Sequence, residues 1–254
     1  MKTDVHKVYI FLALVLLASL PFYALNLATV SLPFGLPPSV AMIVVPLLVA
    51  AVFIWRSGGG QSLKDWFSSI VDMKRVKDKK WLLFAIIFTP IVFLAAYGIG
   101  SLTGHNVNGP TPSLPVMLLI VGVFWIGAIF EELGWTAFAT KPLQKRHGIF
   151  VAGLIIGIVW TSWHVIPYIQ MGRATDWIIF QCIATVGNRI IMGYIYAHSN
   201  QTTSPALFYH AALNFMPEFL PGVYASYNPM VHAVLVWLVV IFLYVKSAKN
   251  KVLS

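Results

Sequence analysis

Ionisable side chains interrupt the apolar stretches of this sequence at five positions, and their types are those that hydrolytic chemistry requires. They are Glu131, Glu132, His164, Arg189 and His210, whereas His232 and Glu218 lie near the ends of such stretches. Burying such a group in an apolar helix costs free energy, so each usually marks a functional site or an ion pair. The same stretches contain no Asp, and neither HExxH nor GxSxG occurs. The sequence therefore excludes paired-aspartate intramembrane proteolysis and gives no support to a zinc protease or serine hydrolase of those motif types.

The two adjacent glutamates are embedded in an apolar run and are expected to do different work. Neighbouring residues of a helix project about 100° apart, so Glu131 and Glu132 cannot serve one point equally. We expect one carboxylate to face a cavity and the other to pair with a neighbouring helix, because a buried charge needs a cation or a hydrogen-bond donor. The alternative is that both are polar contacts between packed helices.

His210 and Asn214 are spaced i, i+4, so they lie on one helix face, one turn apart. Two donors aimed at one point are what an oxyanion or a bound carbonyl requires. His164 is preceded one turn earlier by Trp160. Each histidine taken alone is often only a hydrogen-bond partner between membrane helices, so the argument depends on the whole set.

The elements that carry these residues are expected to be membrane helices. Of 254 residues, 59% are hydrophobic and 10% are charged, against roughly 25% charged in a soluble domain. This composition excludes a disordered chain, a nucleic-acid reader and a conventional soluble enzyme. The single Cys182 cannot form an intrachain disulfide. The sequence predicts an all-α integral membrane protein, a bundle of about eight transmembrane helices formed by residues 1–254 as one polytopic domain.

Apolar runs near the length that crosses a bilayer define the expected spans. They are 8–30, 40–55, 81–100, 114–140, 149–170, 177–198, 205–219 and 230–245, of which the second and seventh are short. Fifteen of the seventeen Lys and Arg residues lie on one side of this arrangement. By the positive-inside rule we expect a multi-pass protein of the plasma membrane with both termini in the cytoplasm. The segment 61–80 mixes apolar and charged residues, which fits a helix lying on the inner leaflet or, equally, a solvated loop.

In these residues the sequence resembles the CPBP family, the type II CAAX prenyl endopeptidases and bacteriocin-processing or immunity proteins, also called the ABI family. The family pattern is Glu-Glu-x-x-x-Arg, then aromatic-x-x-x-His, then His-x-x-x-Asn, each on a membrane helix. Glu131 and Glu132 begin the first motif, Trp160 and His164 form the second, and His210 to Asn214 forms the third. The order and spacing agree over a core of about 114–219.

One position departs from the family pattern: Thr136 stands where the first motif ends in Arg. In the family that Arg is thought to support the second glutamate. Arg189, the one Arg within an expected span, is the alternative cation, and an intramembrane Arg needs a partner as much as Glu132 does. We therefore expect an ion pair between Arg189 and Glu132.

The resemblance implies hydrolysis of a peptide bond in or beside the membrane. Glu131 and His164 would activate a water molecule, and His210 and Asn214 would stabilise the oxyanion. Glu132 would complete the catalytic set of five, and Arg189 and Trp160 would support it. No cofactor is assigned: zinc held by a glutamate and two histidines is the less favoured alternative, because the residues lack a close local ligand spacing. The expected partners are the lipid bilayer and a membrane-associated peptide or protein substrate, CAAX-like or of the bacteriocin type, and no nucleic acid.

Two other functions fit part of the sequence. A catalytically silent relative that binds a membrane peptide, as an immunity or scaffold protein, is favoured by Thr136. A small transporter with a proton-binding glutamate would also explain buried charges, but the sequence shows no internal repeat.

Overall fold

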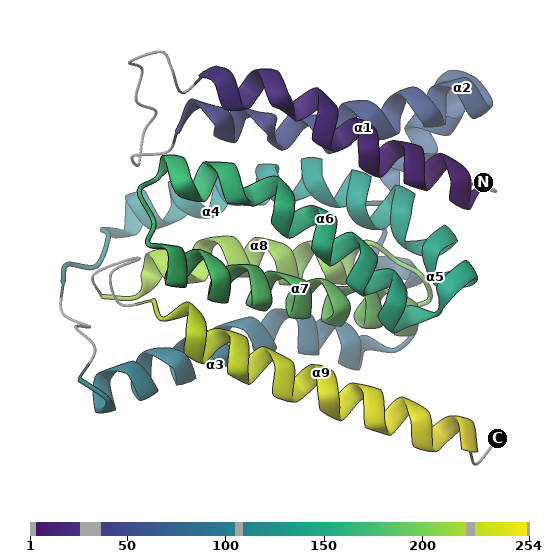
Figure 1. The fold of residues 1–254 in the computed structure, drawn as a ribbon. Coiled ribbons are helices and arrows are strands. Elements are labelled where there is room, and N and C mark those ends of the chain that lie inside the picture. The colour runs from purple at the N-terminus through teal and green to yellow at the C-terminus, as the bar shows by residue number, and fades with distance from the viewer. Residues whose placement is uncertain (1–3, 26–36, 105–108, 222–226, 253–254) are drawn as a thin grey trace.

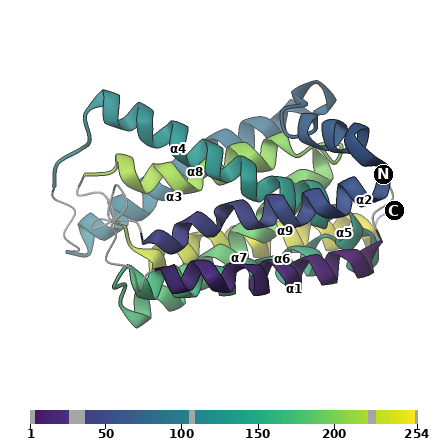
Figure 2. The same cartoon turned by 90° about the horizontal axis from the view of Figure 1, so that it is seen from above.

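The computed structural model describes residues 4–25, 37–104, 109–221 and 227–252. Regular structure in these segments is entirely helical, and the long helices run side by side along one direction (Figures 1 and 2). The elements are α1 (Val5–Ala24), η3 (Pro38–Val44), α2 (Val45–Ser68), η4 (Met73–Arg75), α3 (Lys79–Leu102), α4 (Leu114–Glu132), η5 (Leu133–Thr140), α5 (Lys141–His147), α6 (Ile149–Gln170), α7 (Thr175–His198), α8 (Ser204–Phe219) and α9 (Pro229–Val252). The predicted all-α membrane bundle is confirmed.

Seven helical stretches within the described residues are long and apolar enough to cross a membrane. The remaining expected span, the seventh at 205–219, corresponds to α8, whose 16 residues make it about 24 Å long, short of the roughly 30 Å of hydrocarbon. This helix packs against α3, α4 and α7 in the middle of the bundle (Figure 1). The outer ends of α1 and α9 lie at the same end of the molecule, which requires an even number of traverses (Figure 1). With seven longer helical stretches in the described residues, the short α8 is therefore the eighth crossing of the bundle, and α3, α4 and α7 surround it.

The helix that carries the two glutamates changes its winding directly after them. The regular α-helix ends at Glu132, and residues 133–140 form a π-helix before α5 begins at Lys141. A Cβ on Gly134 would lie 2.7 Å from the Pro46 Cβ and 2.8 Å from its carbonyl oxygen, so only glycine lets α2 approach this closely. The expected uninterrupted helix over 114–140 is thus replaced by an α-helix and a wider π-helix, an element that often marks functional sites.

Small residues hold α6 and α7 together. A Cβ on Gly153 would lie 2.7 Å from the Ile190 Cα, and one on Gly157 would lie 3.1 Å from the Val186 Cα. Close backbone approach of this kind is typical of packed membrane helices. It brings the helix that carries His164 against the helix that carries Arg189.

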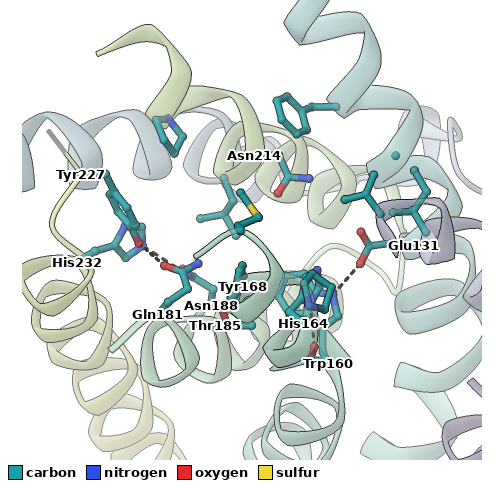
Figure 3. Close-up of a pocket in the computed structure, with 18 of the residues that line it drawn as sticks. Glu131, Trp160, His164, Tyr168, Gln181, Thr185, Asn188, Asn214, Tyr227 and His232 are labelled. Atoms are coloured by element: carbon teal, nitrogen blue, oxygen red, sulfur yellow. Dashed lines mark hydrogen bonds between the residues drawn. The ribbon is translucent and has the colours of Figure 1, made fainter. Parts of the chain in front are cut away.

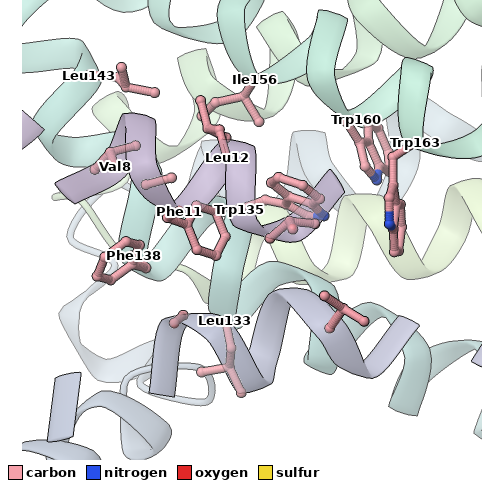
Figure 4. Packing of buried hydrophobic residues seen from close by; sticks show 14 of the residues in the cluster. Val8, Phe11, Leu12, Leu133, Trp135, Phe138, Leu143, Ile156, Trp160 and Trp163 are labelled. Atoms are coloured by element: carbon pink, nitrogen blue, oxygen red, sulfur yellow. The ribbon is translucent and has the colours of Figure 1, made fainter. Parts of the chain in front are cut away.

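Aromatic packing fixes the π-helix against α1. The Phe11 ring centroid lies 5.6 Å from that of Trp135 and 5.0 Å from that of Phe138 (Figure 4). Trp163 on α6 donates from Nε1 to the Ser19 Oγ at 2.7 Å. These contacts hold α1 against the π-helix η5 and against α6, and they hold the Trp135 indole in place.

The second expected span is longer than its apolar run. Helix α2 continues past a kink at Gly58 and Gly59, and Gly59 has a φ of +66°, in the left-handed region that glycine adopts without strain. Beyond the kink, Trp66 is buried whereas Phe67 is exposed. Part of the segment 61–80 is therefore helical and amphipathic, and the rest turns through η4 into α3.

Candidate active site

Glu131 and Glu132 point to different surroundings, as their 100° separation predicts. Glu132 is fully buried and accepts two hydrogen bonds from Arg189, from Nη2 to Oε1 at 2.8 Å and from Nη1 to Oε2 at 3.0 Å. Arg189 is itself only 1% exposed, so this is a buried, bidentate ion pair. The predicted pair is confirmed.

Thr136, which stands where the family motif has Arg, belongs to the same hydrogen-bond network. Its hydroxyl donates to Glu132 Oε2 and accepts from Arg189 Nη1 at 3.3 Å. The Arg189 Cζ lies 4.1 Å from the centroid of the Trp160 ring, a cation–π contact. Glu132 thus has a cation although position 136 lacks one.

His210 lies between the two carboxylates. Its Nδ1 is 2.8 Å from Glu132 Oε1 and its Nε2 is 4.0 Å from Glu131 Oε1. The Arg189-paired carboxylate of Glu132 is an acceptor, so Nδ1 carries a proton and donates it to this bond. The other ring nitrogen, Nε2, faces Glu131.

Glu131 is 4% exposed and is held by two indoles. Its Oε2 accepts from Trp160 Nε1 at 2.7 Å and from Trp135 Nε1 at 3.3 Å. These neutral donors orient the carboxylate without neutralising its charge. Oε1, on the side of His210, is the oxygen available to a further group.

His164 presents a defined tautomer to the same space. Its Nδ1 lies 2.8 Å from the backbone oxygen of Trp160, and a carbonyl oxygen only accepts, so Nδ1 carries the proton. In the neutral ring Nε2 then has the lone pair. The bond therefore leaves one basic nitrogen free, as a general base or a water-orienting group requires.

A cavity of about 200 Å³ joins three of the five residues predicted to be catalytic. Glu131, His164 and Asn214 line it, from α4, α6 and α8 respectively (Figure 3). Glu132 and His210 are buried and hydrogen-bonded to each other, and neither is among the described residues that line the cavity. His210 and Asn214 were expected to face one cavity from the same side of their helix. Asn214 lines the cavity, whereas His210 is hydrogen-bonded to Glu132.

Several residues of this region carry no family motif and were not predicted. Trp135 follows Glu131 by one turn, so its spacing could have indicated the contact. The far end of the cavity holds Gln181, Asn188, Tyr227 and His232 (Figure 3). Their convergence depends on the packing of α7 against α9 and the residues just before it, and has no local sequence signal.

A metal centre has no ready ligand set in this part of the molecule. Within the ranges that the structure describes, no three His, Cys, Asp or Glu side chains are grouped so that they could hold a metal ion. His210 directs Nδ1 to Glu132, and the His164 Nδ1 binds a carbonyl oxygen.

The fold and the site together define a multi-pass membrane protein with a buried carboxylate and imidazole centre. Residues 112–216 match the family described as Type II CAAX prenyl endopeptidase Rce1-like. The chain is also 24% identical to the CAAX prenyl protease 2 of Methanococcus maripaludis, with 70% of each chain covered. The expected resemblance is confirmed: over residues 112–216 the chain is similar to the type II CAAX prenyl endopeptidases.

Proposed function

We propose that this protein is an intramembrane endopeptidase that hydrolyses a peptide bond of a membrane-associated substrate, CAAX-like or of the bacteriocin type. The observation that carries the proposal is the cavity lined together by the Glu131 carboxylate, the His164 imidazole and the Asn214 amide. These groups are a general base, a water-orienting base and an oxyanion donor, placed where apolar walls exclude bulk water. The related CAAX prenyl protease 2 supports the same class of reaction.

In the proposed reaction, Glu131 removes a proton from a water molecule that is also hydrogen-bonded to His164 Nε2. The hydroxide attacks the scissile carbonyl carbon, and the Asn214 amide donates to the oxyanion. Protonated Glu131 then returns the proton to the leaving nitrogen, so the products are a carboxylic acid and an amine. His210 donates to the oxyanion from Nε2 only as an imidazolium, because its Nδ1 proton is engaged by Glu132.

The direct test is cleavage by the purified protein in liposomes. The probes are quenched fluorescent peptides anchored to the membrane, one with a prenylated cysteine near its C-terminus and one with a bacteriocin-type apolar sequence. Mass spectrometry locates the cut, and parallel reactions with a chelator measure metal dependence. Cleavage that requires Glu131 supports the protease. Binding of a probe without cleavage would instead support the silent relative that Thr136 favours.

Asn214→Ala is expected to lower kcat by about 10²-fold with a modest change in KM, because an oxyanion donor acts mainly in the transition state. Combined with His210→Ala, the loss should be smaller than the product of the two single losses if both residues serve one oxygen. Initial rates over a range of probe concentrations measure this. Fully independent losses, or a raised KM at unchanged kcat, would contradict the shared oxyanion site.

The orientation also belongs to the proposal. Both termini lie in the cytoplasm, and the end of the bundle that carries Lys145 faces the inner leaflet of the plasma membrane. In a Cys182→Ser background, Lys145→Cys should react with a membrane-impermeant maleimide only in inverted vesicles, whereas Thr111→Cys should react in intact cells. The reverse pattern would overturn this orientation. Ser226, which the eight-span scheme places on the side of Thr111, lies outside the described residues.

A further inference from the structure

The cavity does not end at Glu131 but continues to a second polar region between α7 and α9. Gln181 and Asn188 from α7 and His232 from α9 line this end, beside Tyr227 (Figure 3). The Tyr227 hydroxyl donates to Gln181 Oε1 at 2.7 Å. This region takes no part in the proposed proton transfers.

A chain of hydrogen bonds fixes the tautomer of His232. The Tyr209 hydroxyl donates to Asn188 Oδ1 at 2.7 Å, which directs the Asn188 amide nitrogen to His232 Nε2 at 3.3 Å. An amide nitrogen only donates, so His232 Nε2 accepts and the proton of the neutral ring lies on Nδ1. Asn188 is 4% exposed and His232 is 2% exposed, so this chain is buried.

The resulting Nδ1–H donor has no acceptor within the described residues. Of the buried polar side-chain atoms without a partner there, it is the one whose residue lines the cavity. A buried donor that stays unsatisfied costs free energy, so native structures rarely keep one without a role. Aromatic rings hold the imidazole, with centroids at 4.6 Å for Phe93 and 5.6 Å for Tyr227.

The chemistry of the walls defines the group that this donor would bind. No Lys or Arg occurs among the described residues that line the cavity, and Glu131 is the one acidic residue there. A carboxylate placed beside His232 would be buried without a cation, which is costly. A neutral acceptor meets no such penalty. The rest of the wall is largely apolar, including Val123 and Phe124.

We propose that His232, oriented by Asn188 and Tyr209, forms a substrate-binding subsite in which its Nδ1–H donates to a main-chain carbonyl of the apolar peptide whose scissile bond lies at Glu131. This subsite rests on the proposed function, because it assumes that the peptide enters the same cavity. It makes His232 a residue that determines affinity and register and takes no part in bond cleavage.

Two substitutions separate the hydrogen bond from packing. His232→Asn places an amide N–H near the position of Nδ1, whereas His232→Phe keeps a ring between Phe93 and Tyr227 and removes both nitrogens. Binding is measured by fluorescence anisotropy of the prenylated probe peptide in a Glu131→Gln background, so cleavage is not needed. His232→Phe should weaken binding about tenfold and His232→Asn by less than threefold. Thermal unfolding of each variant checks that the fold is retained.

A backbone scan tests the acceptor itself. In a series of probes, each carbonyl is removed in turn by an alkene isostere of one peptide bond. One probe of the series should bind the protein with His232 about tenfold more weakly than the parent probe does. That probe and the parent probe should bind the His232→Phe variant with equal affinity. Equal affinities of the two His232 variants, or a scan without such a member, would overturn the subsite.

The outcomes also separate this proposal from the protease proposal. Cleavage that does not depend on His232, with equal binding by both variants, removes the subsite and leaves the protease. Binding that depends on His232 without any cleavage removes the protease and leaves the subsite. A protein that binds and cleaves none of the probes would contradict both.

Discussion

Glu131→Gln is expected to lower kcat on the probe peptide by about 10³-fold or more while leaving the fold and the KM nearly unchanged. The amide keeps the size of the carboxyl group, and its oxygen can still accept from Trp160 Nε1, which now lies 2.7 Å from Oε2. It cannot take a proton from water, so the contribution of the general base, roughly 10²–10⁴-fold, is removed. Initial rates in liposomes and thermal unfolding of the same preparations measure the two effects.

Glu131→Asp is the matched control. It keeps a base but draws the carboxylate away from both indoles, so it should retain more activity than Glu131→Gln with the same stability. Trp160→Phe removes the closer of the two indole donors and should lower kcat less than Glu131→Gln or Glu131→Asp does. Full turnover by Glu131→Gln would transfer the role of base to His164 or Glu132.

The sequence predicted the parts of this site that follow from local geometry and charge. The two glutamates diverge because adjacent helical residues always do, and Arg189 pairs with Glu132 because a buried cation and a buried anion each need the other. The apolar runs likewise predicted the helices, since the length that crosses a bilayer is fixed by its thickness.

The parts that depend on contacts between distant helices were not predictable in the same way. The π-helix after Glu132 arises where Gly134 meets Pro46 of α2, and no local pattern encodes that approach. His210 was expected to share a cavity with Asn214, yet Glu132 holds its imidazole from another helix. The environment of His232 needs Asn188 and Tyr209 from two further helices.

Arg189→Gln is expected to destabilise the protein by about 3–5 kcal/mol, because it leaves the Glu132 carboxylate buried without its cation. Glu132 is fully buried and receives two of its hydrogen bonds from the guanidinium, so water cannot replace them. Denaturant titration of the protein in detergent measures the loss. Arg189→Lys should lose less, since it keeps the charge but not the bidentate geometry.

Two double variants show whether the stability depends on the charge beside Glu132 or on the Arg189 side chain itself. Glu132→Gln with Arg189→Gln removes both charges and should be more stable than either single variant, because no unpaired ion remains. Thr136→Arg with Arg189→Gln moves the cation to the position that the family motif gives it. Thr136 already contacts both Glu132 and Arg189, so an Arg side chain at position 136 starts beside the same carboxylate.

The relocated cation should recover part of the stability and of the turnover that Arg189→Gln loses, whereas Thr136→Arg alone should destabilise by placing two guanidinium groups beside one carboxylate. The readout beyond stability is kcat: Glu132 holds His210 through Nδ1, so a cation returned to Glu132 should restore the rate together with the fold. Arg189→Gln protein that unfolds and cleaves as the parent does would show that Glu132 needs no cation. In that case the carboxyl group would have to be neutral, and His210 would be held by a neutral acceptor.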